Sequence, residues 1–232
     1  NMLNILRDSS YTVVLSGTGL MAESGYPLLR DGAESYEIEE QYGYSFEEIF
    51  SSTFYSARKD LFFRFYKEIL LKAVETPLQD HGLINSIITR RIAGLEDRAG
   101  CRNVINMKGT VYQNVCPSCG KHYPVEYMKS AKGVPLCEDC LVAIRPQVCL
   151  FGEMIDNGVM TKAAEEVAKA EVLIVLGASL TSPLCSQMIQ YYTGSNLILV
   201  SEREHYSDER ADIIVRGRCD DFLKRLVSEL EK

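Results

Sequence analysis

The segment YTVVLSGTGLMAESGYPLLR, residues 11–30, joins a short apolar run to a turn with two glycines and then to a helical pattern. An apolar run of β-branched residues that stops at glycine is typical of a buried strand in a parallel sheet. A glycine turn after such a strand lets backbone N–H groups face a pyrophosphate. The spacing Gly17-x-Gly19 is not the full G-x-G-x-x-G pattern, so an ordinary strand-to-helix turn explains it equally well.

The same run-then-turn design returns later in the chain, in EVLIVLGAS (171–179), NLILVSERE (196–204) and DIIVRG (212–217). Between and after these runs lie helical patterns with apolar residues three and four apart, TKAAEEVAKA (161–170) and DDFLKRLVSELEK (220–232). This alternation predicts an α/β fold with a Rossmann-like, doubly wound parallel sheet. A ligand crevice is expected at the carboxyl ends of the strands, where the strand order reverses.

Two stretches do not fit the strand and helix alternation, and we expect them to form a smaller second lobe. Residues 31–77 are acidic and then aromatic and helical, and residues 116–144 hold paired cysteines. The sequence therefore predicts a nucleotide-binding domain made of 1–30, 78–115 and 145–232, with a helical insert and a zinc-ribbon insert. A chain of 232 residues is long enough for one core plus such a module.

Four of the eight cysteines form two Cys-x-x-Cys pairs with seventeen residues between them, and these are Cys116, Cys119, Cys137 and Cys140. This is zinc-ribbon spacing. A site of four thiolates leaves no open position for water, so a zinc ion there would be structural. Zinc with the other cysteines as free thiols indicates a reducing compartment.

The net charge of −7 and a sequence pI of about 5.1 argue against a nucleic-acid partner, because the basic footprint that neutralises phosphates is missing. The longest apolar stretch, VLIVLGASL at 172–180, is far shorter than the roughly 20 residues that span a bilayer. The first residues do not show the layout of a signal peptide. We therefore expect a cytoplasmic protein that does not bind membranes.

Several segments together resemble the sirtuin family of NAD-dependent protein deacylases. They are SGTGLMAESGYPLLR, INMKGTVYQNVCPSCG, the paired cysteines, IRPQVCLFGE, GASL and IIVRGRCDDFLKRL, and the resemblance runs in order from about residue 11 to 230. It implies a Rossmann domain with a small zinc-binding lobe and NAD in the cleft between them. An acyl-lysine protein or peptide would enter from the other side, and a histidine would act as general base on a ribose hydroxyl.

The resemblance also assigns positions of this sequence to parts of the family's site. It implies that the first NAD loop contains Gly17, Gly19, Glu23, Ser24 and Arg30. It implies that the adenosine side is formed by Gly177, Ser179, Ser201 and Cys219. The family's Thr-Gln-Asn-Ile-Asp run, which contacts the nicotinamide ribose and carboxamide, is matched here by residues 89–93, Thr-Arg-Arg-Ile-Ala, so Arg90 and Arg91 fall in the site.

The departures from the family pattern gather where the chemistry would occur. The catalytic histidine, one residue before a glycine, is Lys108, the phenylalanine that shields the ribose is Leu29, and Ser201 replaces an asparagine. An unperturbed lysine titrates near 10.4, so general-base work near pH 7 would need its pKa lowered by about three units. Burial and nearby arginines could lower it. The simpler interpretation is that the usual reaction is lost.

The added positive charges predict a preference for anions. Lys108, Arg90 and Arg91 replace neutral or anionic groups at a site where positive charge develops on the substrate, which opposes the reaction. ADP-ribose would then bind at least as well as NAD. The alternative is that both arginines pair with Glu96 and Asp97 or point to solvent. Two functions remain open from the sequence: an enzyme that cleaves the glycosidic bond of NAD by deacylation, ADP-ribosyl transfer or hydrolysis, and a nucleotide-binding module without turnover.

Overall fold

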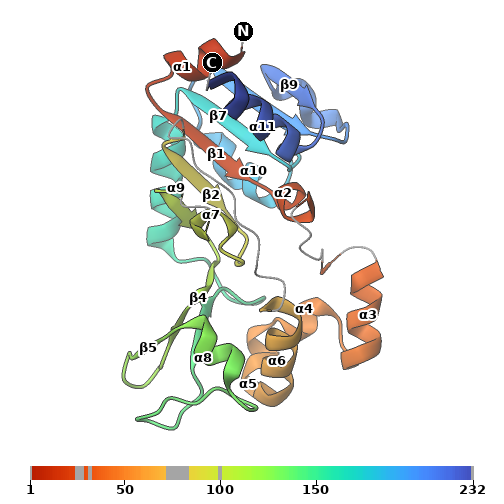
Figure 1. Cartoon of the computed structure of the whole chain (residues 1–232), viewed down its shortest axis with the longest axis vertical. Coiled ribbons are helices and arrows are strands. Elements are labelled where there is room, and N and C mark those ends of the chain that lie inside the picture. The colour runs from red at the N-terminus through yellow and green to blue at the C-terminus, as the bar shows by residue number, and fades with distance from the viewer. Residues whose placement is uncertain (1, 24–28, 31–32, 72–83, 99–100, 231–232) are drawn as a thin grey trace.

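The structure, a computed structural model, describes residues 2–23, 29–30, 33–71, 84–98 and 101–230. Its centre is a parallel sheet with the strand order β3-β2-β1-β7-β8-β9 (Figure 1). The six strands are β1 (Thr12–Ser16), β2 (Ser86–Thr89), β3 (Val104–Asn106), β7 (Val172–Leu176), β8 (Asn196–Ser201) and β9 (Ile213–Arg216). The predicted doubly wound sheet is confirmed.

Helices pack on both faces of this sheet. Alternate residues of each strand point to opposite sides, so each strand contributes side chains to both faces. Val14 and Ile174 pack in one apolar cluster, whereas Val13 and Leu173 pack in another. The first cluster contains side chains from α1 (Met2–Asp8), α2 (Thr18–Glu23) and α11 (Cys219–Leu230). The second contains side chains from α9 (Asn157–Lys169) and α10 (Pro183–Met188). Runs that are apolar on both faces follow from this double cover.

The order of the strands reverses between β1 and β7. From β1 the chain builds β2 and β3 on one side, and it later returns to add β7, β8 and β9 on the other. The carboxyl ends of β1 and β7 lie side by side, since Ser16 pairs with Leu176. This is the position at which open α/β sheets bind their ligands.

The smaller lobe combines a group of helices with a second sheet. The helices are α3 (Ala33–Tyr42), α4 (Phe46–Ile49), α5 (Ser52–Ala57), α6 (Lys59–Phe65) and the π-helix η1 (Tyr66–Leu70). The antiparallel sheet has the order β5-β4-β6, with β4 (Gly109–Val115), β5 (His122–Tyr123) and β6 (Arg145–Val148), and α8 (Val125–Ser130) packs beside it. The expected boundaries of the zinc-ribbon insert, at 115 and 145, fall at the end of β4 and at the start of β6. Both strands belong to the sheet of the smaller lobe.

One apolar cluster joins the two parts of the smaller lobe. It brings Phe62 and Tyr66 of the helices together with Met128 and Ile144 of the cysteine-containing segment. The Lys67 amino group adds polar contacts, donating to the carbonyl oxygens of residues 131 and 133 at 2.8 and 2.6 Å. The helical segment and the cysteine segment therefore form one packed unit.

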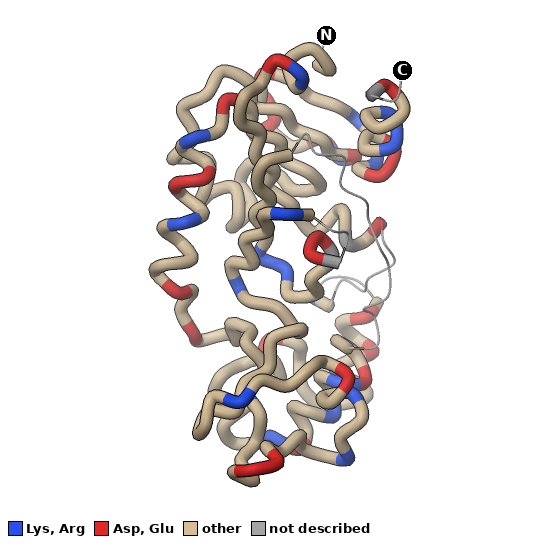
Figure 2. Tube along the Cα trace, turned by 60° about the vertical axis from the view of Figure 1, so that its left-hand side comes forward, with Lys and Arg blue, Asp and Glu red and all other residues tan. Residues whose placement is uncertain are grey.

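The remaining short elements connect these parts. They are α7 (Leu95–Arg98) and the 3₁₀ helices η2 (Ile189–Tyr191) and η3 (Tyr206–Arg210). Among the described residues, no helix combines the length and the apolar character that crossing a lipid bilayer would require. Lysines and arginines are interspersed with acidic residues along the described trace in Figure 2.

Candidate functional site

The glycines of the first loop form a tight seam with the turn after β7. The N–H of Gly17 donates to the Leu176 carbonyl at 2.7 Å, and the N–H of Gly19 donates to the Gly177 carbonyl at 2.8 Å. A Cβ on Gly19 would lie 2.7 Å from the Cα of Gly177, which is itself at φ +62°. These positions require glycine because two backbones touch there. The amides of Gly17 and Gly19 are thus bonded within the seam, so these two N–H groups of the loop are not free for a ligand.

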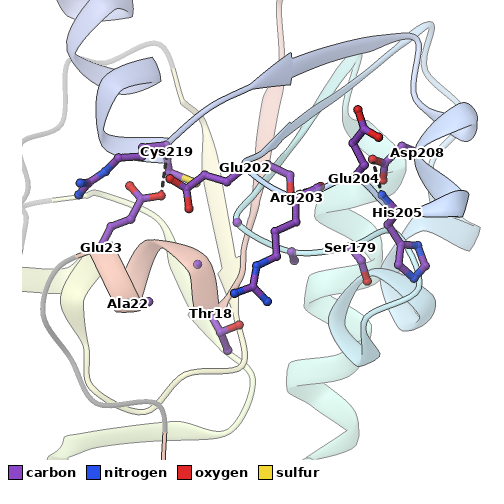
Figure 3. Close-up of a pocket in the computed structure, with 15 residues that line it drawn as sticks. Thr18, Ala22, Glu23, Ser179, Glu202, Arg203, Glu204, His205, Asp208 and Cys219 are labelled. Atoms are coloured by element: carbon purple, nitrogen blue, oxygen red, sulfur yellow. Dashed lines mark hydrogen bonds between the residues drawn. The ribbon is translucent and has the colours of Figure 1, made fainter. Parts of the chain in front are cut away.

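A cavity of about 620 Å³ opens beside this seam (Figure 3). It lies at the carboxyl ends of β1, β7 and β8, where the topology predicts a ligand site. Its lining is Thr18, Gly19, Ala22, Glu23, Gly177, Ala178, Ser179, Ser201, Glu202, Arg203, Glu204, His205, Asp208, Arg218 and Cys219. Six residues that the resemblance assigned to the nucleotide site line this cavity, namely Gly19, Glu23, Gly177, Ser179, Ser201 and Cys219. Ser24 lies outside the described residues.

Glu23 is engaged at the start of the last helix. Its two carboxylate oxygens accept hydrogen bonds from the N–H groups of Cys219 and Asp220, each at 2.8 Å. These amides belong to the first turn of α11, which has no earlier carbonyl to bond and carries partial positive charge. Glu23 thus joins α2 to α11 across the edge of the cavity. The sequence gives no local sign of this contact, because 196 residues separate the two partners.

The loop after β8 is held by its own polar contacts. The Ser201 hydroxyl donates to the Arg203 carbonyl at 3.0 Å, and an Arg216 N–H donates to the same oxygen at 3.1 Å. Arg216 also forms an ion pair with the buried Asp208, which in turn accepts from the backbone N–H of His205 at 3.0 Å. Ser201, which the resemblance assigned to the adenosine ribose, therefore positions the backbone of Arg203.

Lys108 lies at the turn into β4, between the two lobes. Its carbonyl accepts from the Cys149 N–H at 2.8 Å, and its amino nitrogen lies 5.3 Å from the centre of the Phe151 ring. Gly109 follows with φ +75°, and a Cβ there would lie 1.9 Å from the Gln147 carbonyl oxygen, so only glycine fits. The turn that holds Lys108 is therefore fixed by its neighbour, and Lys108 is not among the residues that line the cavity beside the seam.

The environment of Lys108 disfavours its charged form. The side chain is half-buried, and burial lowers the pKa of the amine, with a further decrease from the positive charges of Arg90 and Arg30. No ion pair with a carboxylate is found for Lys108 or Arg90 among the described residues. Arg30 approaches the same Phe151 ring, with its guanidinium carbon 5.6 Å from the ring centre, while its Nε donates to Glu47 at 2.7 Å. Lys108, Arg90 and Arg30 thus lie close enough for their positive charges to repel one another.

Arg91 has a different role from the one that its position suggested. It is buried beneath the glycine loop, donates to the carbonyl of Gly17 at 2.7 Å and to the hydroxyl of Ser16 at 2.5 Å, and pairs with Glu96. Burial lowers the pKa of Arg91 to about 10. The expectation of an unbalanced charge at Arg91 is wrong, and the alternative pairing with Glu96 is confirmed.

Arg90 neither pairs with an acidic residue of its own loop nor points to solvent alone, because its side chain contacts α10. Its guanidinium donates to the side-chain oxygen of Gln187 in α10 at 2.9 Å, and it pairs with neither Glu96 nor Asp97. Asp97 instead accepts from the Asn106 amide at 2.7 Å. Burial lowers the pKa of Arg90 as well. Arg90 and Lys108 are therefore two neighbouring cations for which the described residues provide no carboxylate partner.

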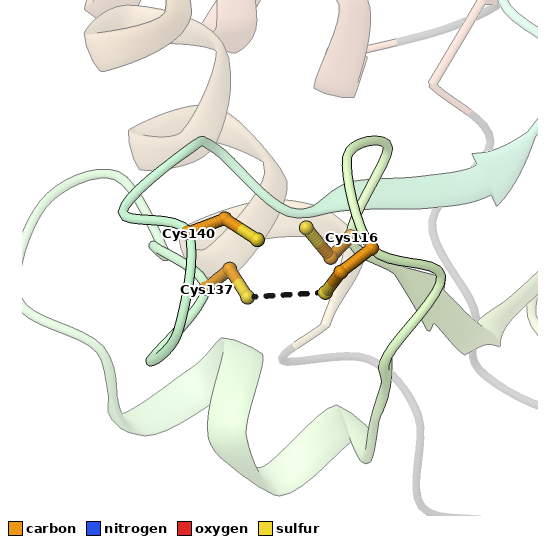
Figure 4. A group of neighbouring side chains, drawn as sticks. Cys116, Cys137 and Cys140 are labelled. Carbon is orange, nitrogen blue, oxygen red and sulfur yellow. Dashed lines mark hydrogen bonds between the residues drawn. The ribbon is translucent and has the colours of Figure 1, made fainter.

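The four predicted zinc ligands come together in the smaller lobe (Figure 4). The sulfur atoms of Cys116, Cys119, Cys137 and Cys140 lie within 4.8 Å of one another. The Tyr123 hydroxyl donates to the Cys137 sulfur at 3.1 Å and thereby lowers the pKa of this thiol to about 6. A thiolate is the form that binds metal. Four sulfurs and no further group in the cluster suit a structural zinc ion.

Comparisons with known proteins agree with this geometry. A sequence model of the Sir2 family matches residues 17–183. The chain is 31% identical to an NAD-dependent protein deacetylase of Clostridium tetani over 99% of the chain and 97% of that protein. It is 29% identical to one of Clostridium acetobutylicum over 96% and 95%. A solved Sir2 with a p53 peptide and NAD+ superposes with a TM-score of 0.79, at 28% identity over 98% of this chain and 96% of that one.

The match covers both lobes, the glycine seam and the cysteine cluster, and it keeps their order along the chain. The chain therefore belongs to the Sir2 family of NAD-dependent protein deacetylases.

Proposed function

We propose that the protein binds NAD or ADP-ribose in the cavity beside the glycine seam, and that ordinary lysine deacetylation is weak or lost. The related protein of Clostridium tetani is named an NAD-dependent protein deacetylase, and a solved Sir2 holds NAD+ and a p53 peptide. One observation carries the loss of activity. At the position of the family's catalytic histidine, this chain has Lys108, a half-buried cation beside Arg90.

The loss follows from the charge of Lys108. A protonated amine has no lone pair, so it cannot accept a proton from a ribose hydroxyl. NAD, when bound, supplies a ribose carbon that becomes positive as nicotinamide leaves, and cations in the cleft raise the energy of that state. Lys108 and Arg90 instead favour a ligand that is negative or neutral at this end. ADP-ribose is therefore expected to bind at least as tightly as NAD, which carries a cationic nicotinamide.

The other residues have supporting roles in this proposal. Gly17, Gly19 and Gly177 let the first loop and the turn after β7 close into the seam that borders the cavity, and Ser179 offers a hydroxyl on the wall of the cavity. The zinc ion would hold the cysteine segment and take no part in catalysis. An acyl-lysine protein or peptide is the expected second partner. A cytoplasmic location fits the eight cysteines, of which four would bind zinc and none forms a disulfide in the structure.

A second function is favoured by the lowered pKa of Lys108. Burial and the charge of Arg90 both push the amine towards its neutral form, which could serve as an unusual general base. The protein would then be an active NAD-consuming enzyme, acting as a deacylase, an ADP-ribosyltransferase or an NAD hydrolase. In that case the rate should rise with pH as Lys108 loses its proton.

The test measures release of nicotinamide from NAD, with and without an acetyl-lysine peptide, between pH 6 and pH 10. The proteins compared are the natural chain, Lys108→Ala, Lys108→His and, as a matched control, Lys162→His in the exposed part of α9. We expect slow or undetectable release from the natural chain and a gain with peptide in Lys108→His alone. A lost general base typically lowers a rate by about 10²–10⁴. Strong peptide-dependent release that disappears in Lys108→Ala would reject the proposal and establish Lys108 as the base.

The restoring variant should leave Arg91 in place. Arg91→Asn would strand the buried Glu96 without its partner, and Ala93→Asp would place a carboxylate in the apolar core of the smaller lobe. Both changes are expected to unfold the protein before they restore chemistry. Calorimetry of the natural chain with NAD and with ADP-ribose completes the test. Binding of neither ligand at millimolar concentration would contradict the nucleotide part of the proposal.

A further inference from the structure

Arg203 extends across the cavity beside the glycine seam. It follows β8 by two residues, and its side chain runs from that loop towards Thr18 at the start of α2 (Figure 3). Its backbone carbonyl is fixed by the Ser201 hydroxyl and by Arg216. No carboxylate pairs with its guanidinium among the described residues. A fixed backbone thus presents an uncompensated cation to the cavity.

Several N–H groups that could bind a diphosphate beside the seam already have partners within the protein. In glycine-loop sites a pyrophosphate is usually held by loop N–H groups and by the start of a helix. Here the amides of Gly17 and Gly19 donate to carbonyls of the neighbouring turn. The first turn of α11, which also borders the cavity, is already bonded to Glu23. Four N–H groups beside the cavity, those of Gly17, Gly19, Cys219 and Asp220, are therefore already bonded within the protein.

Acidic residues in the lining of the cavity would repel a diphosphate. Glu202 and Glu204 flank Arg203 in the sequence, and both line the cavity with exposed side chains. The chain as a whole carries a net charge of −7. A ligand with two phosphate charges would meet repulsion here unless a cation lay close to it. Arg203 and Arg218 are the arginines of the described lining, and Arg218 lies directly before α11.

We infer that Arg203 is the residue that recognises the diphosphate of the bound nucleotide, by donating from its guanidinium to phosphate oxygens above the start of α2. This inference rests on the proposed nucleotide function. A guanidinium presents paired N–H donors whose geometry matches phosphate, and such bonds are stronger than those between neutral groups. Ser201 and Arg216 act as positioning residues, because they hold the backbone from which Arg203 reaches.

The inference predicts that the cost of losing Arg203 grows with the number of ligand phosphates. Calorimetry would measure ADP-ribose, AMP and adenosine binding to the natural chain and to Arg203→Gln. We expect ADP-ribose affinity to fall about tenfold or more and AMP affinity to fall less. Adenosine affinity should stay within about twofold. Arg203→Lys should recover part of the loss, since it keeps the charge but not the paired donors.

Two matched variants remove the same charge elsewhere. Arg210→Gln changes an exposed arginine of η3 that does not line the cavity, and Arg218→Gln changes the second lining arginine. Arg210→Gln should show no phosphate-dependent loss, and Arg218→Gln should show a smaller one than Arg203→Gln. The dependence of ADP-ribose affinity on salt should also become weaker in Arg203→Gln than in either control, because an ionic contact is screened by salt.

The possible results separate the two proposals. If the natural chain binds no nucleotide, the proposed function fails and this inference fails with it. If the natural chain binds ADP-ribose but Arg203→Gln weakens adenosine and ADP-ribose equally, the nucleotide function stands and Arg203 has only a structural effect. If Arg218→Gln causes the larger phosphate-dependent loss, Arg218 is the diphosphate ligand and the assignment of Arg203 is overturned.

Discussion

At the scale of single residues, the environment of Lys108 has two opposing effects on the charge of its amino group. Its amino group is half-buried near Arg90, which disfavours the charge, and it lies over the Phe151 ring, which favours a cation. Burial and the charges of Arg90 and Arg30 both lower the pKa of Lys108. A side chain held in this way is kept at a cost in stability, as is common at functional sites.

We predict that Lys108→Met raises the melting temperature at pH 7 by about 1–2 °C, because it removes a half-buried charge and its repulsion with Arg90. The pKa of Lys108 is lower in the folded chain than the usual 10.5, so the unfolded chain binds more protons between the two values and the natural protein gains stability as pH rises through this window. The advantage of Lys108→Met should therefore shrink towards pH 10.5. Calorimetric melting at several pH values measures this, with the exposed Lys162→Met as control.

A lower melting temperature for Lys108→Met at pH 7 would contradict this prediction. It would mean that the contact with Phe151 stabilises the fold more than the charge destabilises it.

The residue-level predictions succeed where the signal is local. Two Cys-x-x-Cys turns specify the cysteine cluster because each turn brings its own pair of sulfurs together. Arg91 could not be placed in the same way. Its partners are the end of β1 and Glu96, and their position depends on how β1 and β2 pair. The contact between Glu23 and α11 was missed for the same reason, since its partners are 196 residues apart in the sequence. Arg203 was missed because its place on the cavity wall depends on how the loop after β8 folds.

At the scale of secondary-structure elements, α11 depends on a group outside itself. Its first-turn amides at Cys219 and Asp220 bond to Glu23 at the end of α2. The same contact lies at the edge of the cavity beside the glycine seam, because Glu23 and Cys219 both line it. The Glu23 carboxylate thus connects α11 to the end of α2, the helix that follows the glycine loop.

We predict that Glu23→Ala lowers the free energy of unfolding by about 1–2 kcal/mol, because it removes both the cap and the favourable charge at the start of α11. Glu23→Gln should cost less, since its amide oxygen can still accept one of the bonds. The measurement is urea denaturation, with Glu37→Ala on the exposed face of α3 as control. Equal midpoints for Glu23→Ala and Glu37→Ala would show that the cap is dispensable.

The elements themselves were largely predictable. The apolar runs predicted at 11–17, 171–179, 196–204 and 212–217 contain β1, β7, β8 and β9. The helix predicted at 161–170 begins earlier, at residue 157, because the Asp156 side chain accepts from the Val159 N–H and caps it. The second sheet was not predicted. Its strand β4 has an irregular register against β6, and neither strand shows a continuous apolar run.

At the scale of the whole molecule, the two lobes have separate sources of stability. The sheet domain has a core on each face of its sheet, whereas the smaller lobe has one aromatic-rich cluster that includes Cys116 and Cys137. Loss of a metal from the cysteine cluster would therefore affect the smaller lobe first. The division at 30, 77, 115 and 144 stays a prediction, although the arrangement of the cores agrees with two packing units.

We predict that removal of zinc by a chelator, or Cys137→Ser, lowers the melting temperature by about 10 °C or more, because a structural zinc supplies folding energy directly. Hydrogen exchange should accelerate in α6 and β4 while β1 and β7 keep their protection. Cys185→Ser, at a buried cysteine of the sheet domain, is the control that should not change metal content. Unchanged exchange in α6 after verified zinc loss would show that the aromatic cluster holds the lobe alone.

The central place of β1 also sets the timing of its assembly on the ribosome. β1 ends at residue 16, and β7, which pairs along one of its edges, begins only at residue 172. At about 5–20 residues per second, a nascent chain exposes one edge of an apolar strand for roughly 10–30 s before its neighbour is made. Such an edge can pair with other chains. Slower translation between β2 and β7 should therefore increase the protein's dependence on chaperones during synthesis, even though its folded stability is unchanged.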